Sequence, residues 1–202
     1  MPTFDEIKSI LSHYTVGIAG AGGLGSNIAQ TLVRAGVGRL IIADFDVVSE
    51  SNLNRQFYFA DQLGRYKVEA LKENLLRIRP EVTVEIHNLH LTSQNIPVIY
   101  PTVDVMVEAF DVAEMKRVLI ELFASTFPSI PLVVGNGMAG WGNSNTMTVR
   151  EMGNLYLCGD GVSEVSVNLP PIAPRVGICA SQQANVVVSL LLSKYFGNEN
   201  NP

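Results

Sequence analysis

Short apolar runs alternate with amphipathic stretches along the first two thirds of the chain. The runs predict buried strands at residues 16–19, 40–43, 82–86, 103–109 and 131–134. Between them, apolar positions recur at helical spacing and predict helices at residues 4–11, 25–35, 67–79 and 111–127. Strands that alternate with helices are typical of a parallel sheet covered on both faces. We therefore expect an α/β fold with a Rossmann-like, mostly parallel sheet flanked by helices.

The pattern changes in the last third of the chain. Residues 146–150 and 155–158 flank a Gly153–Asn154 turn, which predicts an antiparallel C-terminal extension of the sheet. Glycine-rich residues 135–142 and the proline-containing stretch 159–174 predict long loops, and residues 176–195 predict a mostly apolar helix. No internal repeat or linker interrupts this order, so we expect residues 1–202 to form a single domain.

Four glycines follow the first predicted strand directly. They are Gly20, Gly22, Gly23 and Gly25, and the next strand ends in Asp44. Strand, glycine turn, helix, strand and terminal acid form the fingerprint of dinucleotide-type binding sites. The glycines let the backbone approach a phosphate, which meets the free amides of the helix, and the acid accepts hydrogen bonds from ribose hydroxyls. This arrangement suits NAD and ATP equally well.

Composition narrows the class of partner and the compartment. The chain is 47% hydrophobic and 16% charged, with a formal net charge of −5, and an acidic balance argues against a nucleic-acid partner. Its two cysteines provide neither a disulfide framework nor a CxxC zinc pair. The apolar run at residues 186–192 is shorter than the roughly 20 residues that span a bilayer. We therefore expect a cytoplasmic protein without a membrane partner.

Charged residues on three later segments decide between the two nucleotides. NAD offers a pyrophosphate, whereas ATP adds a third phosphate and a metal ion. Arg55 suits bidentate binding of phosphate oxygens, Lys67 acts as a point charge, and Asp111 is a hard oxygen ligand for Mg²⁺. Taken singly, each is equally well explained as a surface cation or, for Asp111, as a helix cap. Taken together, the three favour ATP with magnesium.

Several sequence blocks resemble the ThiF/MoeB/HesA family, which is related to the ubiquitin-activating enzymes. The blocks are GAGGLGSNIA, ADFDVVSESNLNRQF, GRYKVEALKENLLRIRP, VEAFD and APRVGICASQQAN. Within them, GSNIA and SNLNRQ are most similar to short ThiF-like proteins of thiamine-type sulfur metabolism. The resemblance implies ATP- and Mg²⁺-dependent adenylation of the C-terminal Gly-Gly carboxylate of a ubiquitin-like, ThiS-like sulfur carrier protein in thiamine thiazole biosynthesis. It also implies a homodimer.

The same resemblance assigns roles to individual residues. It places the ribose on Asp44, the phosphates on the glycine turn and Lys67, and magnesium on Asp111. Arg55, Lys67 and Asp111 would carry the catalysis. The nucleotide-binding set is Gly20, Gly22, Gly23, Asp44, Asn52, Arg55 and Lys67.

Three features depart from the family pattern. No CxxC pair is present, so we expect no zinc. No arginine precedes Val16, although relatives often contribute an N-terminal arginine from the neighbouring subunit. Ser166 stands where ThiF enzymes place a sulfur-handling cysteine, and we expect Cys158 and Cys179 to be small buried hydrophobic residues. Activation of the carrier is therefore better supported than sulfur transfer onto it.

Three other functions compete with this one. The chain could adenylate another carboxylate, such as a group on a modified tRNA, or act as a non-catalytic module that binds nucleotide or docks a carrier. An NAD-dependent oxidoreductase is the third, but no hydride-transfer residue is evident. In the glycine-rich loop we expect Trp141 to be a buried anchor, with a lid or a carrier contact as the alternative.

Overall fold

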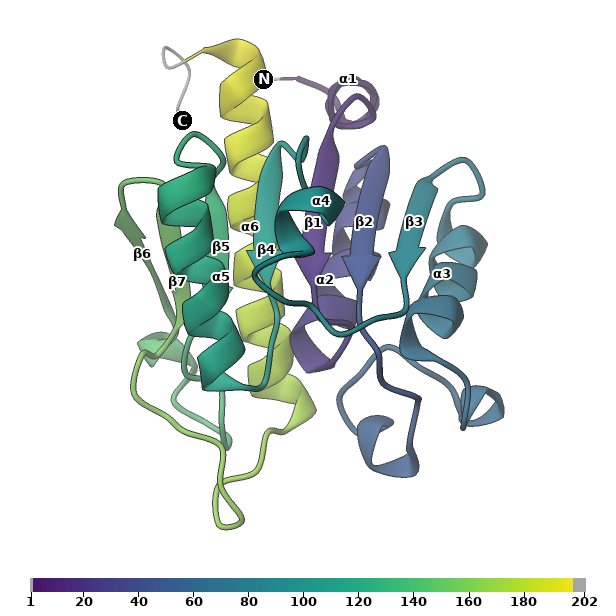
Figure 1. Cartoon of the computed structure of the whole chain (residues 1–202), viewed down its shortest axis with the longest axis vertical. Helices are drawn as coiled ribbons and strands as arrows, with labels where there is room; N and C mark the ends of the chain where they lie inside the picture. The colour runs from purple at the N-terminus through teal and green to yellow at the C-terminus, as the bar shows by residue number, and fades with distance from the viewer. Residues whose placement is uncertain (1, 198–202) are drawn as a thin grey trace.

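One seven-stranded sheet forms the centre of the computed structural model, which describes residues 2–197 (Figure 1). Across the sheet the strands lie in the order β3, β2, β1, β4, β5, β7, β6. Their bounds are Thr15–Ala19 for β1, Arg39–Ala43 for β2, Thr83–His87 for β3, Val105–Glu108 for β4, Leu132–Gly135 for β5, Thr148–Met152 for β6 and Leu155–Gly159 for β7.

The predicted parallel sheet and its C-terminal extension are both confirmed. Strands β3, β2, β1, β4, β5 and β7 pair in parallel, and β6 pairs with β7 in the antiparallel sense. The extension is therefore antiparallel only at its outer strand. Residues 136–147 lead from β5 to β6, which is the outermost strand on this side of the sheet. The hairpin then returns the chain to β7, which lies between β6 and β5.

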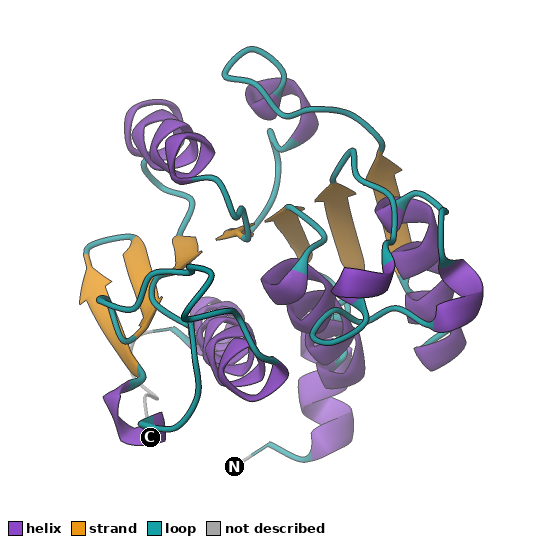
Figure 2. Ribbon diagram, turned by 90° about the horizontal axis from the view of Figure 1, so that it is seen from below, coloured by secondary structure: helices purple, strands orange, loops and turns teal. Residues whose placement is uncertain are grey.

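Helices cover both faces of the sheet (Figure 2). Their bounds are Phe4–Leu11 for α1, Gly23–Ala35 for α2, Lys67–Ile78 for α3, Ile96–Ile99 for α4, Ala113–Thr126 for α5 and Ala173–Phe196 for α6. One apolar core joins α2, α3 and α6 to the sheet, and a second core joins α4 and α5 to its other face. Along β4, Val105 and Val107 face the first core and Met106 the second, as the period of two in a strand requires.

Helix α6 is longer than its apolar pattern predicts. It begins at Ala173 rather than at residue 176, because Pro174 fits the first turn of a helix, where no intrahelical N–H is needed. It has 24 residues, and an 18-residue stretch within it has a mean hydropathy of 1.4, so it is long and apolar enough to cross a membrane by length and composition alone. Here it packs along α2 and against β4, β5 and β7.

The strand order creates a switch point between β1 and β4. The chain leaves β1 through α2 and enters β2 on one side, whereas β4 lies on the other side of β1. Connections that diverge in this way leave a crevice at the carboxyl ends of the two strands, where open α/β sheets bind ligands. The predicted glycine turn follows β1 at this place.

Candidate functional site

The glycine turn between β1 and α2 has two glycines that the fold itself requires. Gly20 has a φ of +100°, and a Cβ there would lie 2.6 Å from the Ala109 carbonyl oxygen. A Cβ on Gly25 would lie 1.9 Å from the Gly20 carbonyl oxygen. Both positions must stay bare for the turn to pack beneath α2 and beside the segment that follows β4. Gly20 is thus needed for the shape of the turn.

Gly22 and Gly23 lie at the start of α2, where backbone amides are free. Gly22 is the N-cap and no side chain caps it, and the first bond of the helix runs from the Ser26 amide to the Gly22 carbonyl at 3.0 Å. A Cβ on Gly22 would meet only the Gln56 amide, at 3.9 Å. Helix α2 has 13 residues, and its N-terminus is open and has no side-chain cap. Such an end offers an anion both N–H donors and the positive end of the helix dipole.

Asp44 lies directly beside this turn, because β1 and β2 are paired in register. Its Oδ2 accepts the Ala21 amide at 2.7 Å and its Oδ1 accepts the Asp46 amide at 2.8 Å. Each carboxylate oxygen can accept more than one hydrogen bond. The side chain is only half-buried, so it combines a fixed orientation with capacity for ribose hydroxyls.

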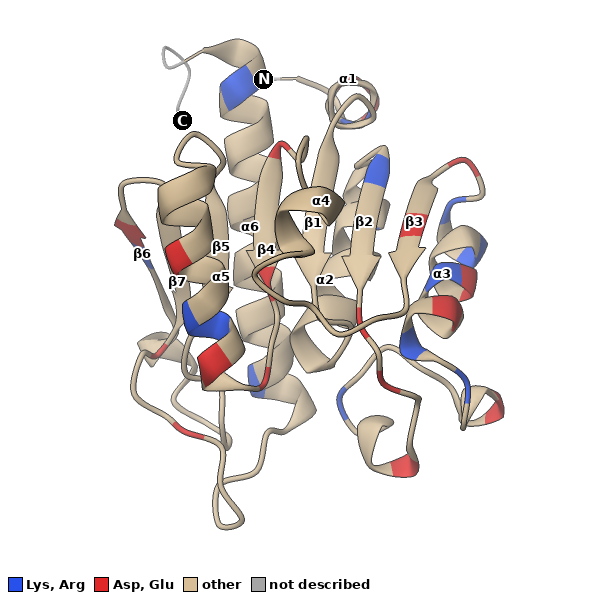
Figure 3. Cartoon of the chain, viewed as in Figure 1, with Lys and Arg blue, Asp and Glu red and all other residues tan. Residues whose placement is uncertain are grey.

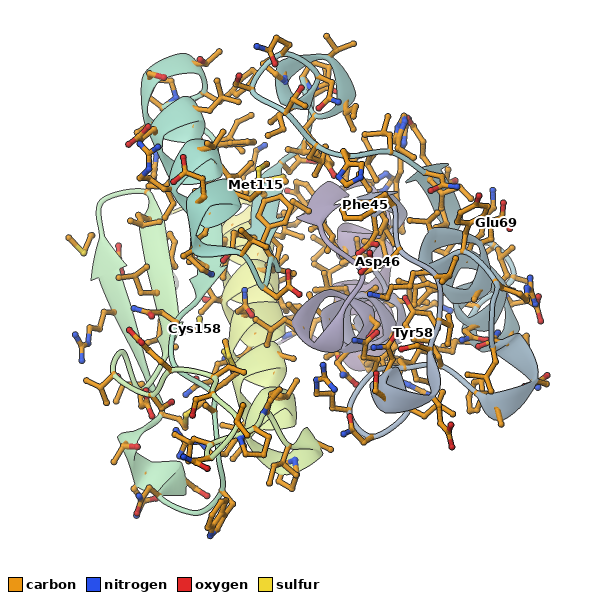
Figure 4. The ribbon with its side chains drawn as sticks, turned by 60° about the horizontal axis from the view of Figure 1, so that its bottom comes forward. Phe45, Asp46, Tyr58, Glu69, Met115 and Cys158 are labelled. Atoms are coloured by element: carbon orange, nitrogen blue, oxygen red, sulfur yellow. The ribbon has the colours of Figure 1, made fainter. Side chains whose placement is uncertain are left out.

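An aromatic pair that sequence patterns did not indicate lies next to Asp44. The ring of Phe45 stacks on that of His90, with centroids 3.4 Å apart and an interplanar angle of 24°. The pair joins the carboxyl ends of β2 and β3, and Phe45 points away from the helices of the first core (Figure 4). Phe45 is 47% exposed, so part of its ring is open to solvent beside Asp44.

Lys67 is paired with an acid that sequence analysis did not single out. Its Nζ lies 2.6 Å from Asp46 Oδ2, and its side chain is 7% exposed. Lys67 is the first residue of α3, where the helix dipole disfavours a cation. Asp46, two residues after Asp44 on the connection from β2, compensates for this and fixes the lysine near the carboxyl edge of the sheet. Figure 3 shows acidic and basic residues along the connection that runs from β2 to α3.

Asn52 and Arg55 lie on the irregular segment after β2, around a short 3₁₀ helix at Glu50–Asn52. Asn52 accepts the Ser49 amide through Oδ1 at 3.0 Å, which shapes this segment. The Arg55 guanidinium donates to the Ser51 carbonyl at 3.0 Å, and its Cγ lies 3.7 Å from where a Cβ of Gly23 would be. Arg55 therefore lies along the open start of α2.

Asp111 lies on the connection from β4 to α5. We expected it to begin the helix, and this is wrong: the N-cap is Val112, without a side-chain cap bond, and α5 starts at Ala113. Asp111 is exposed, and within residues 2–197 its carboxylate has no hydrogen-bond or ion-pair partner. The cap interpretation is thus replaced by a free acid after the strand next to the glycine turn. Within the same described range, no three potential His, Cys, Asp or Glu ligands cluster.

An ion pair with a buried acid, also not indicated by the sequence, supports this edge. Glu108 ends β4 and is fully buried, and its carboxylate is bonded to Lys116 of α5. Lys116 also donates to the Gly135 carbonyl at 2.7 Å. Burial raises the pKa of Glu108, and the Lys116 ammonium opposes that effect. The pair fastens α5 to the ends of β4 and β5, and so holds the connection that carries Asp111.

The two cysteines are buried away from solvent, as expected. Cys158 lies on β7 and Cys179 lies on α6, and burial raises the pKa of each thiol to about 12. A thiol with such a pKa is protonated at neutral pH and is a poor nucleophile. Ser166, which the sequence resemblance aligns with a cysteine, lies on an exposed loop, where its hydroxyl oxygen accepts a hydrogen bond from the Leu169 amide at 3.1 Å.

The loops at residues 136–147 and 160–172 are held together by α6. Arg175, buried in its first turn, pairs with Asp160 and donates to the Gly142 carbonyl at 2.8 Å. Leu169 packs so closely on Gly140 that a Cβ there would lie 2.6 Å from its Cδ1. Trp141 is 68% exposed, so our expectation of a buried anchor is wrong. Arg175 and Leu169 supply the anchoring instead.

Solved structures with this fold cover nearly the whole chain. The E. coli tRNA N6-threonylcarbamoyladenosine dehydratase TcdA, in complex with ATP, has a TM-score of 0.86 at 19% identity, over 96% of this chain and 92% of that one. E. coli MccB in complex with AMPCPP and MccA has a TM-score of 0.72 at 23% identity, over 94% of this chain and 58% of that one. These likenesses establish the fold.

Relatives in sequence place the chain in a family. Ubiquitin-like modifier-activating enzyme 5 of Caenorhabditis briggsae is 30% identical over 183 residues, and the chain spans only about two fifths of it: 83% of this chain against 41% of that protein. Molybdopterin-synthase adenylyltransferase of Salmonella typhimurium is 31% identical over 193 residues, 92% of this chain and 76% of that protein. The sequence model of the ThiF family matches residues 4–202. The chain therefore belongs to the ThiF family.

Proposed function

We propose that the protein transfers the adenylyl group of ATP to the C-terminal carboxylate of a ubiquitin-like sulfur carrier protein. One observation carries the proposal: an uncapped glycine turn, the acid Asp44 and two cations, Arg55 and Lys67, are gathered at one edge of the sheet. A dinucleotide's pyrophosphate is satisfied largely by the turn and the helix end. Additional cations are what a triphosphate requires.

The roles of the residues follow from their positions. Asp44 accepts hydrogen bonds from the ribose, and the amides at Gly22 and Gly23 receive phosphate oxygens. Arg55 approaches the same helix start, and Lys67 reaches the phosphates from α3. The side-chain oxygen of Asn52 shapes the segment that holds Arg55. Its side-chain amide nitrogen is the group that would donate to the triphosphate.

The free carboxylate of Asp111 fits a ligand for Mg²⁺. It is a hard oxygen donor with no partner in the described part of the chain. Magnesium bound there would neutralise charge on the phosphate oxygens of ATP. Asp111 follows the strand next to the glycine turn, which is the side from which such an ion would face the phosphates.

The chemical step requires no covalent bond to the protein. A carboxylate oxygen of the carrier attacks the α-phosphorus, the bond from that phosphorus to the bridging oxygen of the β-phosphate breaks, and pyrophosphate leaves with the electron pair. The products are an acyl-adenylate and pyrophosphate. Arg55 and Lys67 stabilise the negative charge that moves toward the leaving group, and such preorganised contacts are worth about 3–4 kcal/mol of barrier each.

Names of relatives and segments of the sequence support the choice of substrate. The relative from S. typhimurium is named for adenylyl transfer, and that from C. briggsae for activation of a ubiquitin-like modifier. The GSNIA and SNLNRQ segments extend the proposal to a ThiS-like carrier ending in Gly-Gly and to thiamine thiazole biosynthesis. We include a homodimer and a cytoplasmic location in the proposal.

Intact-mass spectrometry of the carrier tests this function. A ThiS-like protein ending in Gly-Gly is incubated with the enzyme, ATP and Mg²⁺, with inorganic pyrophosphatase to pull the reaction forward. We expect a carrier heavier by one adenylyl group. An unmodified carrier, with ATP bound by the enzyme, would favour another carboxylate substrate or a docking module. An enzyme that binds NAD in preference to ATP would reject the proposal.

A further inference from the structure

The hydroxyl group of Tyr58 donates a hydrogen bond to the carbonyl oxygen of Ala21 at 2.7 Å. Tyr58 is 5% exposed and packs in the core beneath the glycine turn (Figure 4). Neither the family resemblance nor the sequence pattern gives this residue a role. We propose that Tyr58 is a positioning residue, whose hydroxyl orients the phosphate-binding amide of Gly22. The inference rests on the proposed function, because it concerns the phosphates of ATP.

Ala21 is held at both of its peptide groups. Its N–H donates to Asp44 Oδ2 at 2.7 Å, and its carbonyl accepts from Tyr58 at 2.7 Å. A trans peptide is planar, and its C=O and N–H point in opposite directions. A carbonyl of Ala21 that points at Tyr58 therefore makes the N–H of Gly22 point away from Tyr58 and from the core. Through residues 2–197 this N–H has no hydrogen-bond acceptor, so it is available to a ligand.

Without the hydroxyl, the Ala21–Gly22 peptide would have no such constraint. Glycine at position 22 has an open environment, and the peptide that precedes it can rotate at little steric cost. Asp44 holds only the preceding peptide, Gly20–Ala21. The Tyr58 bond is thus the contact that fixes the second peptide of the turn before the ligand arrives, and a fixed donor loses less freedom on binding than a mobile one.

The hydroxyl remains a donor across the pH range in which the protein would work. Burial raises the pKa of Tyr58 well above its ordinary value, and the carboxylates of Asp44 and Asp46 raise it further. A phenolate would be unable to donate and would repel a phosphate. A neutral phenol serves the turn without adding negative charge beside it.

The ring of Tyr58 also packs in the core, so the loss of this packing must be kept separate from the loss of the hydroxyl. Phenylalanine keeps the ring and its packing, and removes only the hydroxyl. Tyr100 offers a matched control, because it is also buried and its hydroxyl donates to a backbone carbonyl of β1, that of Ile18, at 3.0 Å. That carbonyl precedes the turn and orients no phosphate-binding amide.

The test compares two ligands that differ only in phosphates. Dissociation constants for ATP and for adenosine are measured by displacement of a fluorescent ATP analogue, on the wild type, Tyr58→Phe and Tyr100→Phe. We expect Tyr58→Phe to bind ATP about fivefold to tenfold more weakly, the effect of one hydrogen bond, and adenosine within twofold of the wild type. Tyr100→Phe should keep the wild-type ratio of the two constants. Tyr58→4-aminophenylalanine, which keeps the ring and supplies an N–H donor in place of the hydroxyl, should restore the ATP preference.

The possible results separate the positioning role of Tyr58 from the proposed function. A Tyr58→Phe protein with the wild-type ratio of constants overturns the positioning role and leaves the proposed function intact. Equal losses for ATP and adenosine also overturn it, since they indicate a general structural effect. A wild-type protein that binds neither ligand overturns the proposed function and this inference with it.

Discussion

The ammonium group of Lys67 lies 2.6 Å from the carboxylate of Asp46. The same lysine donates its backbone amide to the Asp46 carbonyl at 2.9 Å, so the first residue of α3 is tied twice to the connection after β2. The lysine side chain is 7% exposed and that of Asp46 is 45% exposed. A cation is therefore held on the connection that begins at Asp44, whose carboxylate contacts the glycine turn.

This pair makes Asp46 a contributor to stability. In Asp46→Asn the buried Lys67 ammonium loses its charged partner, and we expect the free energy of unfolding in urea to fall by about 1–3 kcal/mol. Glu73→Gln, which removes the partner of Arg65 in a pair exposed by 41% and 47%, serves as control. It should cost less than about 1 kcal/mol. Equal losses in the two variants would show that the Lys67–Asp46 pair is no stronger than a surface pair.

Two glycines of the turn should respond differently to alanine. Gly25→Ala places a methyl group 1.9 Å from the Gly20 carbonyl, so we expect little folded protein by circular dichroism. Gly22 has a φ of −80°, and there is room for a methyl group beside it. Gly22→Ala should therefore fold with a melting temperature close to that of the wild type.

The methyl group of Gly22→Ala would nevertheless stand where a phosphate approaches. We expect ATP binding, measured by calorimetry, to weaken by at least tenfold in this variant. A folded Gly22→Ala protein with wild-type affinity for ATP would contradict the placement of the phosphates at the start of α2.

Arg55 and Asp111 should be needed for activity and not for folding. Both side chains lie on connections at the carboxyl edge of the sheet, outside the two cores. In Arg55→Ala and Asp111→Ala we expect adenylation rates to fall by about 10²–10³-fold, which corresponds to the loss of one preorganised contact, with unchanged circular dichroism. Arg65→Ala, which removes an exposed cation on the connection from β2 to α3, is the matched control. Near-normal rates in both variants would reject their catalytic assignment.

The two cysteines should be inert in the folded protein. Burial raises both thiol pKa values to about 12, so at pH 8 few thiolates exist and reagent cannot reach them. We expect slow labelling by iodoacetamide in buffer and rapid labelling of both residues in guanidinium chloride. Rapid labelling of one thiol in buffer, located by peptide mapping, would instead indicate a reactive cysteine.

Much of the fold was predictable because its strands, helices and glycine turn follow from the residue pattern within short segments of the chain. The strand that ends at Ala19, the glycines after it and the acid after β2 lie within one continuous βαβ unit, where spacing alone predicts the turn. The start of α5 was misplaced by two residues, since the β4–α5 connection needs Asp111 and Val112 to leave the strand before the helix can begin.

The polar contacts within the site were not predictable in the same way. Lys67 and Asp46 are 21 residues apart, and Tyr58 and Ala21 are 37 apart. Hydrophobic periodicity shows which face of an element is buried, but it carries no information on which polar groups meet between elements. Trp141 was misassigned for a related reason, because aromatic residues are usually buried, whereas here Arg175 and Leu169 already hold the loop.

We propose that ATP activates a C-terminal carboxylate at this site. The most direct test of this proposal is exchange of labelled pyrophosphate into ATP, with Mg²⁺ and a ThiS-like carrier ending in Gly-Gly, against the same carrier without its last glycine. We predict exchange that requires the intact tail and is lost in Arg55→Ala. Exchange at the same rate with the truncated carrier, or no exchange by a wild-type protein that binds ATP, would contradict the claim.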